Sequence, residues 1–315
     1  MKTQIKKITI GLLSVAMIGF TSCNKKDAEE QTRGQLKVEM TDAPYDNSEV
    51  EAVFVTVAGI SLDGKAVENF ETQTIEISAY TGGSSTIVFD DSIDVGSYNE
   101  VELEFDYKST DNGNSPGCYV LTNDGKKHDL NSSSGLKSSV SLGKAIQVTS
   151  TSAAELIVDM DLRKCIQKEG DASSDDRYEF VSKTRFEGAF RTNDMSAVGH
   201  IEGELNVERE EDEVMVVYAY KQGAYSESEA NLDSETQLRF LKAETSAKVN
   251  AQGKYTLAFL EEGKYELVVA KYRVISSGQL EFDSTLDLML KTNGSVGNTV
   301  TVKSETSVSV VLGLF

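Results

Sequence analysis

One pattern restricts the fold of this chain more than any other: short runs in which apolar and polar residues alternate one by one. The clearest run is EVELEFDY at residues 100–107, where apolar residues are separated by acidic ones. Successive side chains of a β-strand point to opposite faces of the sheet, so this run predicts a strand with one face in a core and the other in water. We expect Val101, Leu103, Phe105 and Tyr107 to face inward.

The same alternation occurs near the start of the chain and again in its middle. The residues predicted to face inward are Leu36, Val38 and Met40 in the first run, and Leu156, Val158, Met160 and Leu162 in the second. The polar residues between the latter, Asp159 and Asp161 above all, are predicted to form a solvated strand face. Two carboxylates on one strand do not by themselves supply the six or more oxygens of a calcium site.

Turn residues separate these strands. Asp124-Gly125 is the dipeptide typical of a tight hairpin, and Asp42 and Pro44 end the first run, because proline cannot join a ladder and aspartate bonds nearby backbone amides. The largely apolar run 52–62 is expected to be a central strand. A chain of 315 residues with 2 prolines has room for two domains of ordinary size, and we predict an all-β fold.

Three separated motifs point to a family. They are GQLKVEMTDAP at 34–44, GKKHDL at 125–130 and LIVDMDLRKC at 156–165. In this order they resemble the N-terminal domain of an uncharacterised family of bacterial lipoproteins, which opens on Gly-x-Leu-x-Val-x-x-Thr-Asp-Ala-Pro. The resemblance implies a domain of unknown function over 34–191 with an immunoglobulin-like or transthyretin-like β-sandwich fold, and it implies no activity. Cys165 stands where that family has serine.

A second unit is predicted over 197–315, after a short linker. The run VMVVYAY at 214–220 and the two Gly-Lys-Tyr turns at 253–255 and 263–265 are similar to a carboxypeptidase-regulatory-like, transthyretin-like domain. The resemblance implies a second β-sandwich in tandem with the first. Each glycine of the repeated turns is expected to adopt positive φ, and residues 234–244 are expected to form a short helix with Ser234 as its N-cap.

The N-terminus predicts targeting to the cell envelope. Lysines precede an apolar segment, Ile8 to Phe20, that is too short to span a bilayer. Thr21 and Ser22 before Cys23 resemble a bacterial lipoprotein lipobox, in which Phe20 is unusual. The resemblance implies a signal peptide over 1–22, acylation of Cys23 as the membrane anchor, and a flexible tether over 23–33. The alternative is an ordinary secretory peptide with a chance cysteine.

We therefore expect an outer-membrane lipoprotein of a Gram-negative bacterium. Charged residues early in the tether favour display on the cell surface, and a periplasm-facing location is the alternative. The compartment permits disulfides. A bridge between Cys118 and Cys165 would close a loop of about 50 residues and stabilise the fold by about 4 kcal/mol; otherwise both cysteines are small buried hydrophobes.

The sequence offers no catalytic site, cofactor site or metal site. His128 and His200 are the two histidines, and they lie in different predicted domains. GNSPG at 113–117 fits a nucleophile motif, but Pro116 after Ser115 lacks the backbone N–H that an oxyanion hole needs. A net charge of −20 disfavours nucleic acid as a partner.

We therefore predict a non-enzymatic, lipid-anchored β-sandwich protein that binds or presents a glycan or an envelope protein. Tyr218, Tyr220 and Tyr225 are the best candidates for a sugar-stacking surface; the alternative is that they are core and edge rings. A second function is also open: a structural assembly subunit resembling lipoprotein-type fimbrial pilins, in which a terminal strand is exchanged between subunits.

Overall fold

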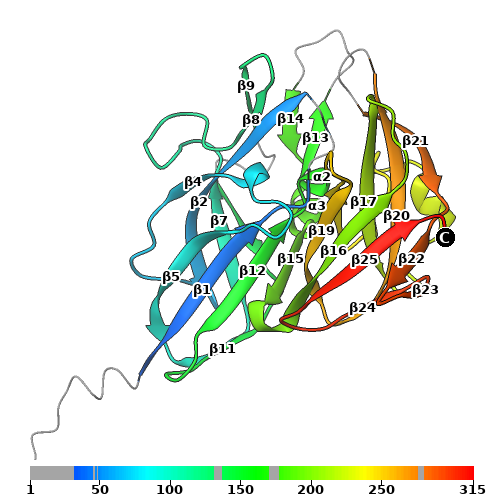
Figure 1. Cartoon of the computed structure of the whole chain (residues 1–315). Coiled ribbons are helices and arrows are strands. Elements are labelled where there is room, and N and C mark those ends of the chain that lie inside the picture. Colours follow the sequence, from blue (N-terminus) through cyan, green and yellow to red (C-terminus); the bar gives the residue numbers. More distant parts are fainter. Residues whose placement is uncertain (1–31, 45–46, 48, 131–136, 170–176, 276–279) are drawn as a thin grey trace, which may run out of the picture.

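The computed structural model describes residues 32–44, 47, 49–130, 137–169, 177–275 and 280–315. Cys23, the expected signal peptide and all but the last two residues of the expected tether lie outside these residues. Within them, no helix has the length and apolar character needed to cross a membrane. The strands group into two β-sandwich domains that lie side by side, the N-terminal one blue to green and the C-terminal one yellow to red (Figure 1).

The N-terminal domain is built on two sheets within the described residues. The first has the order β15-β12-β1-β5, with β1 and β12 parallel. The second has the order β10-β7-β2-β8-β9, and β3 and β4 also pair with β2. The first sheet consists of β1 (Arg33–Thr41), β5 (Thr86–Asp94), β12 (Ala154–Met160) and β15 (Phe190–Asp194). The second consists of β2 (Val50–Leu62), β3 (Lys65–Ala66), β4 (Gln73–Glu76), β7 (Val101–Asp106), β8 (Tyr119–Thr122), β9 (Lys127–Asp129) and β10 (Lys137–Ser141).

Short elements connect and close this sandwich. Two small ladders pair β6 with β11 and β13 with β14, and two short helices flank β13 and β14 in the chain. These elements are η1 (Ile77–Ala79), β6 (Gly96–Tyr98), β11 (Ile146–Val148), α2 (Leu162–Cys165), β13 (Ile166–Glu169), β14 (Arg177–Phe180) and α3 (Lys183–Glu187). Helix α2 follows β12 directly, because the Asp161 carboxylate accepts a hydrogen bond from the backbone N–H of Arg163 and so caps the turn.

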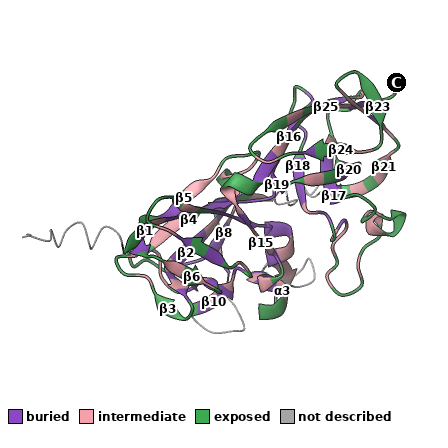
Figure 2. Ribbon diagram, turned by 90° about the horizontal axis from the view of Figure 1, so that it is seen from below, coloured by how far each residue is buried: buried purple, intermediate pink, exposed green. Residues whose placement is uncertain are grey.

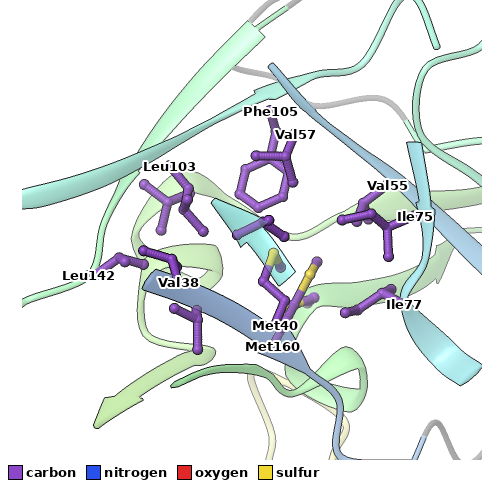
Figure 3. Packing of buried hydrophobic residues seen from close by; sticks show 14 of the residues in the cluster. Val38, Met40, Val55, Val57, Ile75, Ile77, Leu103, Phe105, Leu142 and Met160 are labelled. Atoms are coloured by element: carbon purple, nitrogen blue, oxygen red, sulfur yellow. The ribbon is translucent and has the colours of Figure 1, made fainter. Parts of the chain in front are cut away.

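The alternation predicts the core of this domain correctly. Every residue predicted to face inward in the three runs is at most 3% exposed. These side chains meet between the two sheets, where Val38 and Met40 of β1 and Met160 of β12 face Leu103 and Phe105 of β7 (Figure 3). The predicted central strand is β2, which pairs with β7 and β8, and the predicted hairpin at Asp124-Gly125 joins β8 to β9.

The C-terminal domain also has two sheets in the part of the chain that the structure describes. One has the order β19-β16-β25-β22-β23, with β16 and β25 parallel, and the other has the order β18-β17-β20-β21, with β24 on β20. The first contains β16 (Val198–Asn206), β19 (Lys254–Glu261), β22 (Met289–Thr292), β23 (Ser295–Gly297) and β25 (Ser307–Gly313). The second contains β17 (Glu213–Lys221), β18 (Thr245–Lys248), β20 (Gly263–Val274), β21 (Leu280–Leu286) and β24 (Val300–Val302), and η2 (Met195–Ala197) and η3 (Glu227–Ala230) lie outside the sheets.

This second sheet is covered on both faces. One face packs on the other sheet of the sandwich, and the opposite face of β17 and β20 is covered by the irregular connection between β17 and β18. Buried residues accordingly line the inner parts of both domains, and exposed ones concentrate on loops and edges (Figure 2). The connection places Phe240 in a buried position, stacked on Tyr218 with 4.3 Å between ring centroids.

Three local predictions differ from the structure. Residues 234–244 are not helical: the Asp233 carboxylate accepts hydrogen bonds from the backbone of Glu235 and Thr236, and Gln237 and Phe240 have φ of 56° and 54°, so the segment turns instead. Of the two Gly-Lys-Tyr turns, Gly253 has positive φ and Gly263 does not. The expected linker is mostly strand, because β15 continues to Asp194.

Candidate functional site

The first and last motifs of the N-terminal domain meet at a buried polar cluster. Asp42, which follows β1, is 5% exposed, and its Oδ1 accepts a hydrogen bond from the backbone N–H of Leu162 at 3.2 Å. Parallel pairing of β1 with β12 brings both strand ends to the same edge of the sheet, which explains the contact. Burial and the nearby charge of Asp159 raise the pKa of Asp42 well above its usual value.

Asp161 and Arg163 form the charged centre of this cluster. The guanidinium of Arg163 donates from Nε to Asp161 Oδ1 at 3.0 Å and from Nη2 to Oδ2 at 2.7 Å, and both residues are 5% exposed. Burial opposes ionisation of Asp161, but Arg163 and Lys164 outweigh it and lower the pKa of this carboxyl. The predicted solvated face is therefore wrong, because Asp159, Asp161 and Arg163 face the C-terminal domain and the cluster rather than water.

Arg191 joins this cluster to the C-terminal domain. Its Nη2 lies 2.6 Å from Asp159 Oδ2, and its Nη1 donates to the backbone carbonyl of Phe259 at 2.6 Å. Asn193 Nδ2 donates to the same carbonyl at 3.2 Å. Phe259 can present this carbonyl because β16 and β19 have a bulge here and Phe259 has φ of 53°. The strand irregularity thus supplies the acceptor that holds the two domains together.

Apolar and cationic contacts extend the domain interface. Ile157 of β12 packs with Val198, Ala258 and Phe259 in a small buried cluster. On the other side of the cluster, Lys164 Nζ donates to the carbonyl of Ala243 at 3.1 Å, and the Arg163 guanidinium lies 5.2 Å from the centroid of the Tyr218 ring.

A pocket of about 710 Å³ opens beside this interface and is lined by both domains. The volume is in the range typical of small-ligand sites. The N-terminal domain contributes Asn47, Arg163, Ile166, Gln167, Lys168 and Arg185. The C-terminal domain contributes Leu232, Glu235, Thr236, Gln237, Leu238 and Arg239 from the irregular connection, and Tyr272, Leu280, Glu281 and Phe282 from β20 and β21. We call this the interdomain pocket.

Two of the four cationic side chains that line the interdomain pocket form ion pairs with carboxylates. Arg163 is paired with Asp161, and Lys168 Nζ lies 3.0 Å from Glu49 Oε2. Arg185 of α3 instead donates from Nη1 to Gln167 Oε1 at 3.4 Å, and Arg239 donates to the carbonyl of Ala230. In the described part of the chain, neither Arg185 nor Arg239 has an ion pair.

The aromatic rings of the interdomain pocket are also engaged. The Arg239 guanidinium lies 4.5 Å from the centroid of the Phe282 ring. Tyr272 is 7% exposed, and its hydroxyl lies 2.8 Å from that of Tyr218. The pocket therefore offers guanidinium groups, two exposed carboxylates and aliphatic surface, rather than an open ring face.

The tyrosines proposed as a sugar-stacking surface do not form one. Tyr218 and Tyr220 are 1% and 0% exposed, because the connection between β17 and β18 covers their face of the sheet. Tyr225 is half-buried and packs edge-on against Tyr220 at 5.2 Å. The alternative weighed from the sequence, core and edge rings, describes them. The sequence predicts the strand that carries Tyr218 and Tyr220, but it contains no signal for the connection that covers them, in which Tyr225 itself lies.

Cys118 and Cys165 do not form a disulfide in the structure. Both are free and 0% exposed. The thiol of Cys118 accepts a hydrogen bond from the Thr56 N–H at 3.4 Å, whereas Cys165 ends α2 among apolar neighbours. Burial raises the pKa of Cys118 to about 12 and that of Cys165 well above its usual value. They behave as small buried hydrophobes.

The remaining candidates stay apart. His128 Nε2 lies 3.3 Å from the Thr122 hydroxyl in the N-terminal domain, and His200 Nδ1 accepts a hydrogen bond from Phe259 N–H in the C-terminal domain. Ser115 lies in a loop. Across the described residues, no group of three or more His, Cys, Asp or Glu side chains is placed to hold a metal ion.

Residues 33–180 match the family profile described as Domain of unknown function (DUF4382). A domain of unknown function thus covers most of the N-terminal sandwich. The match ends before α3 and β15, so Arg185 and Arg191 lie beyond it. No curated protein matches the chain.

Several solved structures match the chain at low similarity. The TIE protein of Bacillus anthracis is 11% identical over 90% of this chain and 34% of its own, with a TM-score of 0.19. BcpA, the major pilin subunit of Bacillus cereus, is 9% identical over 90% of this chain and 71% of its own, with a TM-score of 0.20. GBS52, the minor pilin of Streptococcus agalactiae, is 11% identical over 88% of this chain and 94% of its own, also at 0.20. Scores this low support no inference about the arrangement or function of this chain.

Proposed function

We propose that this chain is a non-enzymatic, lipid-anchored protein of the bacterial cell envelope that binds a glycan or protein partner in the interdomain pocket. One observation carries the proposal: a pocket of about 710 Å³ lies between two sandwiches that are joined by buried contacts, and its wall includes two arginines that form no ion pair with a described residue. A cavity with apolar surface and a few charged groups is the default binding site of an uncharacterised fold.

The anchor and the location belong to the same proposal. The lipobox-like sequence before Cys23 and the polar residues after it support acylation and attachment to the outer membrane, with the two domains carried outward on a tether. Acyl labelling of the wild type and of Cys23→Ala tests the anchor, and protease treatment of intact cells tests surface display. The transthyretin-like character of the C-terminal domain is likewise proposed from its Gly-Lys-Tyr repeats.

Blocking the interdomain pocket tests binding. Leu232 is 52% exposed and lines the pocket, so Leu232→Trp fills space without disturbing a core. Ile87 is 47% exposed and does not line it, which makes Ile87→Trp the matched control. We expect glycans on an array, or proteins in an envelope extract, to be retained by the wild type and by Ile87→Trp and lost by Leu232→Trp. Equal retention by all three proteins would contradict the assignment of the site.

An assembly subunit is the second candidate, and one observation favours it. The end of the C-terminal domain exposes Met289, Val296, Leu314 and Phe315, on and next to β22, β23 and β25. Apolar residues gathered at one end can cover a neighbouring copy. Sedimentation of the acyl-free chain distinguishes the two functions: a subunit of this kind forms multimers as concentration rises, whereas a binding protein stays at the mass of one chain.

A further inference from the structure

The interdomain pocket contains two guanidinium groups that form no ion pair with any residue the structure describes. Arg185 comes from α3 of the N-terminal domain and Arg239 from the irregular connection of the C-terminal domain. Their hydrogen-bond acceptors among the described residues are neutral oxygens, those of the Gln167 side chain and the Ala230 backbone. The chain has 51 acidic against 31 basic residues, and ion pairs to carboxylates are formed by Arg33, Arg163, Arg191 and Arg273. Arg185 and Arg239 form none with the described residues and line the same pocket, which indicates an anionic ligand.

The other charges limit how much negative charge that ligand can carry. Glu235 and Glu281 line the same pocket and are exposed, with no ion pair to a described residue. Arg185 is also near enough to Asp233 to contribute, after the hydrogen bonds from Thr236, to a lowered pKa of that carboxyl. A dianionic phosphate or sulfated polymer would be repelled by these carboxylates, whereas a single carboxylate group meets the two arginines with little repulsion.

The other residues that line the pocket can hydrogen-bond to sugar hydroxyl groups, but its aromatic rings are not open for a neutral sugar to stack on. The Phe282 ring is already covered by Arg239, and Tyr272 is buried. Glu235 and Glu281 are acceptors with no ion pair to a described residue, and Gln237 supplies an amide group beside the same volume, whereas the amides of Asn47 and Gln167 are hydrogen-bonded within the N-terminal domain. Carboxylate and amide oxygens accept hydrogen bonds from hydroxyl groups.

We infer that the interdomain pocket binds a saccharide bearing one carboxylate per sugar, a uronic acid unit, with that carboxylate held between Arg185 and Arg239 and its hydroxyls donating to Glu235 and Glu281. The inference rests on the proposed function and names its ligand class. Because the arginines come from different domains, the ligand also bridges the two sandwiches.

Calorimetric titration with trigalacturonic acid tests this, using the mature chain with Cys23→Ala. The wild type is expected to bind it, and the methyl-esterified trisaccharide, which lacks the charges, is expected to bind at least tenfold more weakly. Arg185→Gln is expected to weaken binding at least tenfold. Lys183→Gln removes the same charge from the same helix outside the pocket and is the matched control; it should leave the dissociation constant unchanged.

Two more variants test whether binding depends on the positive charge of the arginines or on the planar arrangement of their guanidinium donors. Arg185→Lys keeps the charge but loses the planar donors, so it should bind more weakly than the wild type and more tightly than Arg185→Gln. Arg239→Gln should give a loss similar to that of Arg185→Gln. Circular dichroism before titration verifies that each variant is folded.

Three results would overturn the inference. Equal affinity for the acid and its methyl ester would remove the carboxylate from the recognition. An unchanged affinity in Arg185→Gln would remove the arginine pair. Binding of an acidic tripeptide in place of the saccharide would assign the site to a peptide. If one of these results is obtained and Leu232→Trp still abolishes binding of a ligand, the uronic acid inference fails but the proposed binding function stands. If Leu232→Trp leaves ligand binding unchanged, both the inference and the proposed function fail.

Discussion

Replacing Arg191 by methionine should destabilise the protein strongly, because Arg191 pairs with a buried carboxylate and also contacts the other domain. The substitution leaves Asp159, which is 5% exposed, without its cationic partner and removes the hydrogen bond from Nη1 to the Phe259 carbonyl. Removing one partner of a buried ion pair costs about 3–5 kcal/mol. The Arg191 side chain is 18% exposed, and solvent can partly replace it, so we place the loss at the lower end, about 3 kcal/mol.

The loss should depend on pH in a defined direction. Burial already raises the pKa of Asp159 in the folded wild type despite Arg191, and removing that cation raises it further. A carboxyl whose folded pKa lies above its unfolded pKa destabilises the fold once pH exceeds the unfolded value, because the folded state then holds a proton that the unfolded state has released. The destabilisation by Arg191→Met should therefore be larger at pH 7 than at pH 4, where Asp159 is protonated in more of the folded molecules.

Urea unfolding followed by far-UV circular dichroism measures the free energy of unfolding of each variant. The double variant Asp159→Asn/Arg191→Met removes the charge that would be left unpaired, and it should recover at least half of the loss. A loss below about 1 kcal/mol for Arg191→Met, which is the range of an exposed ion pair, would refute the reasoning. So would a double variant less stable than the single one.

Two further predictions test packing inside the domains. Gly203→Ala should destabilise the C-terminal domain by about 1–3 kcal/mol, since a Cβ at Gly203 would lie 1.9 Å from the Tyr255 ring. The control Gly297→Ala should change the unfolding midpoint little, because nothing lies within 4 Å of a Cβ at that position. Cys118 and Cys165 should react with a thiol reagent at pH 8 only after unfolding, because both thiols are buried and have raised pKa values. Rapid reaction of the folded chain would show that the cores open, and no reaction after denaturation would show a disulfide.

The alternation in the sequence predicts which side chains enter the sandwich core, but not what covers the opposite face of the same strand. For β7 the opposite face is in contact with water, as the pattern predicts, since Glu100 is exposed and Glu102 and Glu104 are partly exposed. For β12 the same pattern gives buried carboxylates, because a second domain packs there and Arg191 neutralises Asp159. Polar residues on a strand indicate that the face is not part of the apolar core; they do not distinguish water from a partner with matching charges.

The interdomain pocket could not be predicted for a related reason. Its residues come from the segment before β2, from α2, β13 and α3, from the connection between β17 and β18, and from β20 and β21, and no local pattern links them. Leu238 and Leu241 have the spacing of one face of a short helix, whereas hydrogen bonds to Asp233 and positive φ at Gln237 turn the chain. Tertiary packing of Phe240 on Tyr218 overrides the local helical pattern.

The motifs shared with the domain of unknown function therefore stabilise the fold beside the pocket, and the arginines proposed to bind the ligand lie outside these motifs. Asp42 fixes the start of α2, and Asp161 caps it and pairs with Arg163. These contacts set the direction of β13, which forms one wall of the pocket. Arg185 lies beyond the matched residues 33–180, and Arg239 lies in the other domain. A chain carrying the N-terminal domain alone would keep the hydrogen bonds that Asp42 and Asp161 make to α2, but it would lose the C-terminal cover of the buried cluster and Arg239 of the arginine pair. The proposed ligand specificity therefore depends on how the two sandwiches are joined.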